Sequence, residues 1–364
     1  MPKPSTPTPS DLSWQLFTGQ RIPHDRIGEL PRPPRWRPRR AEVLPGEERA
    51  WPQASDPSSG LRGAALERAR TFHATPAIVE VVNAALYLRR PLLVTGRPGS
   101  GKSSLVDAIA YELRLGPALR WPVTSHSTLR DALYQYDAIG RLQDDPRDNP
   151  LPRSPEQKAE SVGRFLTLGP LGTALLPTER PRALLIDEID KSDIDLPNDL
   201  LNVFEEGEYE VPELRRLGEA LPVRVMTSDP EQPHVTVHGG RVRCCEFPLI
   251  VMTSNGEREF PAPFLRRCLR LQMPNPTGDR PEDDNEKGWR LREIVKLHFP
   301  AQDLTAAEAV IQNFIDLALD QKHDLATDQL LNAVYFVLEP HAKPAEERSR
   351  VLAHLLQSLS GPRT

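Results

Sequence analysis

The sequence predicts an α/β fold in which helices sandwich a parallel sheet, followed by a domain made of helices alone. Three observations predict it. The motif G-x-x-x-x-G-K-[ST] lies at 96–103, between an apolar run of strand type and a segment with apolar residues at helical spacing. The apolar runs at 183–186 and 248–253 have the length of buried strands, and each is followed by polar residues. From about 286 to 359, apolar residues recur at i, i+3 and i+4.

The segment at 96–103 has the composition of a loop that binds phosphate. Its glycines let the backbone wrap closely round a phosphate chain, and the N-terminus of the next helix favours an anion. Lys102 would reach the β- and γ-phosphates, and the Ser103 hydroxyl would hold Mg²⁺. A glycine-rich turn with a purely structural role is disfavoured, because a strand and a helix flank the motif. We therefore predict ATP and Mg²⁺ as cofactors, with the nucleotide bound by Gly96, Pro98, Gly99, Ser100, Gly101, Lys102, Ser103 and Ser104.

Two acidic residues follow the apolar run at 183–186. Asp187 would act through Mg²⁺ and its water ligands, so Ser103 and Asp187 are the candidate metal residues. Glu188 would orient and polarise the attacking water. Strands often end in solvated acids, but the phosphate loop upstream favours a functional role here.

Polar and basic residues follow the run at 248–253. The side chain of Asn255 could lie beside the γ-phosphate and help to hold the water. Arg266 and Arg267 end a short predicted helix, and in a ring of subunits such an arginine reaches the nucleotide of the neighbour and stabilises transition-state charge. The position after Asn255 favours this role over a solvated helix face. The candidate catalytic residues are Glu188, Asn255, Arg267 and Arg266, with Arg267 preferred as the finger.

The composition divides the chain into a leader at 1–62, a nucleotide-binding αβα domain at 63–280 and a helical lid domain at 281–364. The Pro- and Arg-rich leader buries little apolar surface, so we expect it to be extended or disordered until something receives it. Five arginines and a tryptophan at 31–40 allow a nucleic-acid contact, a strap over a protein core, or a tail that aids solubility. The strap is favoured by the anchor-like residues Trp14, Leu16, Phe17, Ile22 and Ile27.

The overall composition excludes several function classes. A net charge of −5 gives no reason to expect an extended nucleic-acid surface. The three cysteines lack C-x-x-C spacing and the nine histidines lack metal-ligand spacing, so we expect reduced thiols and no histidine-bound metal. No run approaches the roughly 18 apolar residues of a membrane span, and the N-terminus has no signal-type apolar region. We therefore expect a cytoplasmic protein without a membrane contact.

The ordered set of phosphate loop, Asp187-Glu188, Asn255 and Arg266-Arg267, followed by a helical lid, resembles the AAA+ ATPases among the P-loop NTPases and, more narrowly, the MoxR family. The segment at 165–172 occupies the place of a Gly-Pro hairpin in that family. A second family hairpin corresponds to 208–211 and 235–242, and the helix at 195–207 to the segment after the acidic pair. The stretch at 17–37 resembles the leader of MoxR-type ATPases encoded in bacterial conflict or defence operons.

The resemblance implies ATP hydrolysis by a homo-oligomer, a hexameric ring, with a chaperone-like action that remodels or activates a protein client. That client would contain a von Willebrand A domain or an effector module. One departure concerns the lid, where 326–329 lacks the basic residue that family members often carry, and Lys322 is the nearest basic candidate. Two alternatives stay open: a nucleic-acid-dependent motor of a restriction or defence system, and a slow nucleotide-loaded switch or scaffold.

Overall fold

The structure, a computed structural model, describes residues 14–37, 42–143, 154–218, 221–275, 288–299, 304–319, 325–338 and 345–356. The packing of the chain divides it into two units. The first unit comprises Met1–Ala69, Ala74–Val94 and Ser103–Leu271. The second unit comprises Arg70–His73, Thr95–Lys102 and Gln272–Thr364.

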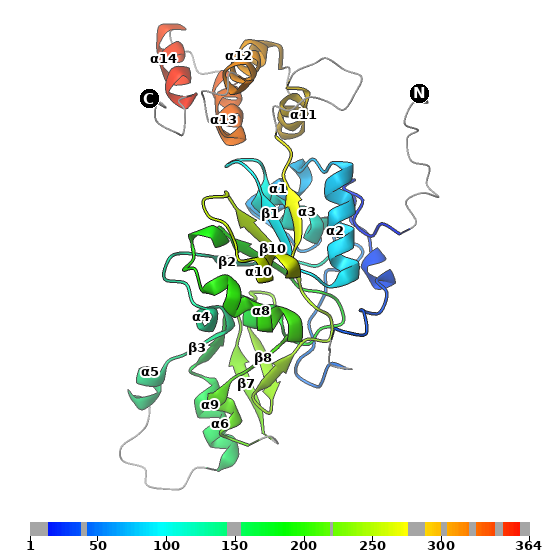
Figure 1. Cartoon of the computed structure of the whole chain (residues 1–364), viewed down its shortest axis with the longest axis vertical. Helices are drawn as coiled ribbons and strands as arrows, with labels where there is room; N and C mark the ends of the chain where they lie inside the picture. The colour runs from blue at the N-terminus through cyan, green and yellow to red at the C-terminus, as the bar shows by residue number, and fades with distance from the viewer. Residues whose placement is uncertain are drawn as a thin grey trace. The chain divides into compact units, whose positions relative to one another are not determined.

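A parallel sheet forms the centre of the fold and confirms the predicted α/β class (Figure 1). Its strands follow the order β11-β1-β10-β5-β2, and both β10 and β2 pair parallel to β5. Every residue of β10 and all but the last of β5 are buried, as expected for strands covered on both faces. The bounds are β1 Leu92–Thr95, β2 Leu119–Pro122, β5 Ala183–Asp187, β10 Leu249–Ser254 and β11 Leu269–Gln272.

Among the helices of the first unit, α2 (Pro76–Leu88) begins and ends at residues with capping chemistry. This helix has proline in its first turn, the Thr75 side chain accepts a hydrogen bond from the Ile78 N–H, and Arg89 ends it at φ 51°. The apolar residues of 76–88 predict a helix over this range, and the bounds agree. The other helices of this unit include α1 Gly63–Thr71, α3 Lys102–Glu112, α4 Leu129–Leu133, α5 Ala138–Gln143, α7 Pro170–Ala174, α8 Leu196–Glu206, α9 Pro212–Arg215 and α10 Ala262–Arg267, with a 3-10 turn η2 at Ile189–Lys191.

A second sheet differs from the hairpins that the sequence predicts. Its order is β3-β4-β7-β8, and β7 and β8 form an antiparallel pair that the sequence analysis did not identify. Of the predicted second hairpin, 208–211 supplies β6, which pairs with β9, whereas 235–242 is divided between β8 and β9. The bounds are β3 Tyr134–Tyr136, β4 Leu166–Leu168, β6 Glu208–Glu210, β7 Pro222–Met226, β8 His234–His238 and β9 Arg241–Arg243.

The Pro- and charge-rich composition of 144–160 predicts a surface loop, whereas helix α6 (Pro155–Gly163) occupies part of this segment. Ser154 begins it with a capping box, in which its side chain accepts from the Gln157 N–H while the Gln157 side chain accepts from the Ser154 N–H. The remainder of the predicted loop, at 144–153, lies outside the described residues.

The leader runs along the first unit and contains a short 3-10 turn, η1 (Arg26–Glu29). Leu16 and Phe17 are each 1% exposed, and their N–H groups both donate to Asn83 Oδ1, at 2.7 and 3.0 Å. Further along, the Thr236 N–H of β8 donates to the Gly46 carbonyl at 3.0 Å. These contacts favour the strap interpretation for the described part of the leader. Of the predicted anchors, Ile22 is 61% exposed and Trp14 is 43% exposed.

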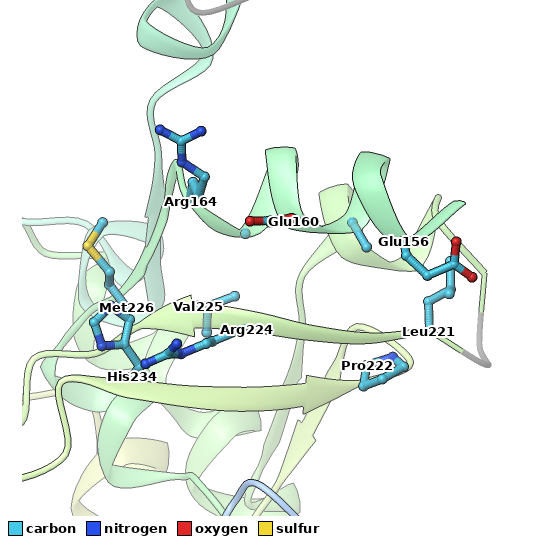
Figure 2. A pocket seen from close by; sticks show the side chains of 11 residues that line it. Glu156, Glu160, Arg164, Leu221, Pro222, Arg224, Val225, Met226 and His234 are labelled. Atoms are coloured by element: carbon cyan, nitrogen blue, oxygen red, sulfur yellow. The ribbon is translucent and has the colours of Figure 1, made fainter. Parts of the chain in front are cut away.

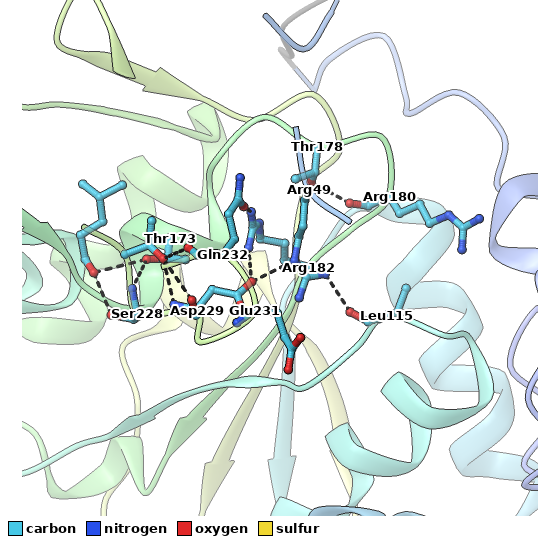
Figure 3. Close-up of polar contacts among 12 residues, drawn as sticks. Arg49, Leu115, Thr173, Thr178, Arg180, Arg182, Ser228, Asp229, Glu231 and Gln232 are labelled. Carbon is cyan, nitrogen blue, oxygen red and sulfur yellow. Dashed lines mark hydrogen bonds and ion pairs between the residues drawn. The ribbon is translucent and has the colours of Figure 1, made fainter. Parts of the chain in front are cut away.

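A buried charge network joins the leader to the β7–β8 connection (Figure 3). The Asp229 carboxylate accepts from Arg49 Nε at 2.9 Å and from Arg182 Nη1 at 2.6 Å. Gln232 donates its Nε2–H to the carbonyls of Glu47 and Glu48. Burial and the neighbouring Arg49 charge lower the pKa of Arg182 to about 9. Because Asp229 neutralises two buried guanidiniums, loss of this carboxylate would leave uncompensated charge.

The second unit contains the helical lid, with α11 Trp289–His298, a 3-10 turn η3 at Leu304–Ala307, α12 Glu308–Leu319, α13 Thr327–Leu338 and α14 Ala345–Leu355 (Figure 1). Apolar side chains at helical spacing form its core, including Leu291, Val295, Ile311, Phe314, Ile315, Leu330 and Val334. None of the helices in the described part combines the length and apolar character needed to cross a membrane.

Candidate nucleotide-binding site

The predicted phosphate loop connects β1 to α3. Gly96, Gly99 and Gly101 have φ values of 155°, 71° and 85°, which side chains rarely tolerate. A Cβ atom on Gly99 would lie 2.7 Å from the Cβ of Ala326, just before α13. Glycine is therefore required at this position both for the backbone conformation and for the close approach.

Lys102 and Ser100 each place a buried polar group in the loop. Lys102 is 8% exposed, and its Nζ donates to the carbonyls of Gly96 at 2.8 Å and Arg97 at 2.9 Å. The Oγ of Ser100 is buried and has no hydrogen-bond partner among the described residues. A buried ammonium and an unsatisfied hydroxyl in a glycine-rich loop fit a site for phosphate oxygens. Pro98 is exposed in this loop, and Ser104 lies half-buried in the first turn of α3.

Ser103 and Asp187 lie together at the ends of α3 and β5. The Ser103 hydroxyl donates to Asp187 Oδ1 at 2.8 Å, and the Thr253 hydroxyl donates to the same oxygen at 2.5 Å. Hydroxyl and carboxylate oxygens are hard ligands, so Ser103 and Asp187 fit Mg²⁺. The sequence analysis did not assign a role to Thr253. Its only sequence signal is its position at the end of a strand, two residues before Asn255.

Glu188 has a strained backbone, with φ 59° and ψ 49°. For a residue other than glycine this conformation costs about 1–3 kcal/mol, and such strain concentrates at functional sites. Its N–H donates to Thr253 Oγ1 at 2.8 Å. Its carboxylate pairs with Lys191 Nζ at 2.7 Å and lies 3.5 Å from Asn255 Nδ2, a long hydrogen bond. The structure therefore brings Glu188, Asn255 and Asp187 into one hydrogen-bonded group.

Asp190 fixes the segment that carries Asn255. It is 5% exposed, and its Oδ2 accepts from the N–H groups of Asn255 at 2.9 Å and Glu257 at 3.2 Å. A carboxylate that accepts two backbone N–H bonds orients the chain after β10. Sequence reasoning missed this residue, because the acids at 187 and 188 already accounted for the motif.

The two predicted finger arginines have other partners in the described structure. Arg267 donates from Nε to Glu205 Oε1 at 2.5 Å and from Nη1 to the Pro263 carbonyl at 3.3 Å. The Arg266 carbonyl accepts from Arg90 Nη1 at 3.1 Å. In the part of the chain that the structure describes, no hydrogen bond or ion pair joins either arginine to Glu188 or Asn255.

The start of α13 provides the lid contact to the loop. Ala326 packs against Gly99, and its N–H donates to Gln329 Oε1 at 2.8 Å. The residues here are neutral or acidic, as in the predicted departure at 326–329. The basic candidate Lys322 lies outside the described residues.

A hollow of about 450 Å³ lies elsewhere, between α6 and β7 (Figure 2). Ala159, Gly163 and Val225 contribute apolar or small groups to its lining, with charged side chains such as Glu160 and Arg224 around them. None of the predicted nucleotide residues lines it. The candidate site is therefore the loop and acidic group, and not this hollow.

A loop of this geometry, followed by paired acids and an asparagine on neighbouring parallel strands, defines a nucleotide-binding domain of the P-loop class. Residues 91–268 match the family model described as an AAA domain of the dynein-related subfamily. This span of the chain is therefore similar to the AAA domains of that subfamily, a group that includes MoxR-like ATPases. Domains of this class bind and hydrolyse nucleotides in general.

Solved structures with detectable similarity are more distant. NtrX from Brucella abortus bound to ADP has 14% identity and a TM-score of 0.37, over 74% of this chain and 53% of that chain. The same protein bound to ATP has equal identity and TM-score, over 81% and 53%. The closed state of Hsp104 with ATPγS and FITC casein has 15% identity and a TM-score of 0.36, over 76% and 44%. The chain thus spans about half the length of these structures, and no curated protein matched it.

Proposed function

We propose that this protein is a Mg-ATP-dependent AAA+ ATPase of the MoxR type, which hydrolyses ATP in a cytoplasmic homo-oligomeric ring, a hexamer, and remodels or activates a protein client. The observation that carries the proposal is the hydrogen-bonded group of Ser103, Asp187, Thr253, Glu188 and Asn255 directly after the phosphate loop. The group supplies residues of the types that phosphoryl transfer to water uses for metal binding and water activation, which supports the proposal.

Each residue of the group has a task in this mechanism. The loop N–H groups and Lys102 bind the phosphates and orient the γ-phosphoryl group. Mg²⁺ held by Ser103 and Asp187 would neutralise charge on the phosphate oxygens. Glu188 accepts a proton from the attacking water, while Asn255 holds that water in line. Thr253 fixes Asp187 and the Glu188 backbone relative to each other.

The proposal is tested by separating nucleotide binding from hydrolysis. Lys102→Ala is expected to abolish ATP binding, because the buried ammonium that pairs with the phosphates is lost. Glu188→Gln is expected to bind ATP and to lose turnover, because an amide does not accept the proton of water. Equilibrium binding of a fluorescent ATP analogue and phosphate release measure the two steps. Normal turnover by Glu188→Gln would rule out its assigned role.

Ring assembly is proposed because, among the described residues, neither Arg266 nor Arg267 is bonded to Glu188 or Asn255 of its own chain. We expect the specific activity of the unsubstituted protein to rise with protein concentration as subunits assemble. Arg267→Ala should lower the hydrolysis rate about 10³-fold or more at saturating assembly, by removal of transition-state charge stabilisation. If neither Arg267→Ala nor Arg266→Ala changes hydrolysis at any protein concentration, the finger assignment is wrong.

The client is proposed to be a protein, with a von Willebrand A domain or an effector module as the expected type. Helix α5 carries Ile139 and Leu142, which are 71% and 75% exposed, and exposed apolar pairs of this kind suit a protein contact. Affinity capture from native cells with ATP-loaded Glu188→Gln should recover a protein that Lys102→Ala does not retain. Recovery of nuclease-sensitive nucleic acid instead would favour a nucleic-acid motor.

A further inference from the structure

Four arginines lie in one region of the first unit. They are Arg37 of the leader, Arg90 between α2 and β1, and Arg266 and Arg267 of α10, and we call them the arginine cluster. Glu205, near the C-terminal end of α8, pairs with Arg267. Among the described residues, no carboxylate pairs with Arg37, Arg90 or Arg266.

A hydrogen bond holds Arg37 next to Glu205, the partner of Arg267. The Nη1 of Arg37 donates to the Phe204 carbonyl at 2.8 Å, and Phe204 directly precedes Glu205. The guanidinium also lies 5.9 Å from the centroid of the Phe247 ring. The Nε of Arg37 is buried and has no hydrogen-bond partner in the described structure. A buried donor without a partner is unfavourable, and an anion that reaches it would satisfy it.

The charge balance of the arginine cluster also favours an anion. Burial lowers the pKa of Arg37, and the neighbouring Arg90 and Arg267 charges add to this shift, while Glu205 opposes it. The charges of Arg37, Arg90 and Arg267 thus share one carboxylate in a partly buried region, which is unfavourable without a further negative charge. A phosphate group suits the vacant donors, because a planar guanidinium can bind two of its oxygens at once.

We propose that Arg37 is a third phosphate-binding arginine beside Arg266 and Arg267, so that the leader completes the site that receives the γ-phosphate of the nucleotide bound by the neighbouring subunit. The inference rests on the proposed ring ATPase and extends it to a residue outside the nucleotide-binding domain. A different role is that Arg37 only caps the C-terminal end of α8 within its own subunit. The two roles differ in whether Arg37 acts only within its own subunit or on the nucleotide of a neighbour.

The first experiment compares Arg37→Ala with Arg35→Ala at a protein concentration that saturates assembly. Arg35 is an exposed arginine of the same leader segment, so it is a matched control for charge. We expect Arg37→Ala to lower the hydrolysis rate about 10- to 100-fold, the loss expected for one of several transition-state donors, and Arg35→Ala to leave it unchanged. An unchanged rate in Arg37→Ala would overturn the proposal.

The second experiment tests whether Arg37 acts between subunits. Glu188→Gln subunits do not hydrolyse ATP but keep an intact arginine cluster. When they are mixed with Arg37→Ala subunits, each Arg37→Ala subunit beside one of them receives a complete site, so phosphate release per Arg37→Ala subunit should rise. A mixture of Glu188→Gln with unsubstituted subunits gives the baseline for any inhibition. A reduced rate that the mixture does not restore would assign Arg37 to its own subunit and overturn the proposal.

The same measurements separate failure of this inference from failure of the ring ATPase proposal. If Arg37→Ala is insoluble, Arg37→Gln is carried through the same mixing experiment, because its amide can still donate to the Phe204 carbonyl. Absence of hydrolysis or of assembly in the unsubstituted protein would overturn the ring ATPase proposal itself and this inference with it. Hydrolysis and assembly in the unsubstituted protein, without a loss in Arg37→Ala, would overturn only the inference.

Discussion

A single side chain, that of Thr253, links the two acidic residues of the site. Its hydroxyl donates to Asp187 and accepts from the backbone N–H of Glu188. The hydroxyl therefore couples the strand that carries the proposed metal residue to the strained backbone of the proposed base. Because a hydroxyl both donates and accepts, only Ser or Thr can make this bridge with so few atoms.

Thr253→Val is expected to lower hydrolysis about tenfold or more, since it removes the hydroxyl with little change in volume and misorients two groups of the mechanism. It should also destabilise the protein by about 1–3 kcal/mol, because the Glu188 N–H loses its acceptor. Thr253→Ser is the matched control, which keeps the bridge. Phosphate release and urea unfolding measure the two effects. Equal rates for the Val and Ser variants would show that the bridge is not needed.

The leader shows how a whole segment with few apolar residues becomes ordered against neighbouring helices. Its backbone polar groups are paired by buried side chains of the helices it crosses. Asn83 of α2 accepts from two N–H groups and donates Nδ2 to the Phe17 carbonyl at 2.7 Å. Glu112 of α3 accepts from the N–H groups of Thr18, Gly19 and Arg21. Such segments lack regular structure, so their order depends on side-chain partners elsewhere.

Asn83→Ala should release the first part of the described leader. The substitution leaves two buried N–H groups and one carbonyl without partners, at a cost of about 2–4 kcal/mol. We expect faster proteolysis near Leu16 and a lower urea midpoint. Gln20→Ala, at an exposed leader position, is the control. Unchanged proteolysis in Asn83→Ala would mean that apolar burial alone holds this part of the leader.

Elements differ in how well their sequence predicts them. Helix α2 is evident from its apolar spacing and its N-terminal Thr75-Pro76 pair, because helical hydrogen bonds are local. The β7–β8 pair was missed, since β7 alternates buried and exposed residues over only five positions and begins with proline. Its register depends on residues 234–238 and on the partner strand β4, which are not neighbours in the sequence.

The reaction rate of the buried thiols shows whether the whole first unit is folded. Cys244, Cys245 and Cys268 are buried, and none of them forms a disulfide in the described structure. Burial raises the pKa of Cys244 and of Cys268 from the ordinary 9.0 to about 12. At pH 8 this shift lowers their thiolate fraction about a thousandfold, since each pKa unit is a factor of ten. All three thiols should react slowly with a disulfide reagent in the native protein and rapidly in urea. Fast reaction of the native protein would contradict this packing.

The same thiols make folding sensitive to alkaline pH. Because the folded pKa of Cys244 and Cys268 lies above the unfolded value, the native state binds more protons between pH 9 and about 12. Their contribution to stability is therefore complete below pH 9 and is lost as the pH rises toward 12. Urea unfolding at pH 8 and pH 10 should show a lower midpoint at pH 10. Cys268→Ala should reduce that difference, and an unaltered difference would contradict the role of this thiol.

The sequence by itself determined the phosphate loop, the acidic pair at 187–188, the strands that carry them and the helical character of the lid. These features depend on backbone conformation and on side-chain periodicity, which act over a few residues. Only the tertiary structure decided that Thr253 bridges Asp187 and Glu188, that Asp190 holds the segment of Asn255, and that Arg37 lies beside the finger pair. Those contacts join residues far apart in the chain, and their geometry arises from strand pairing and burial that no local pattern encodes.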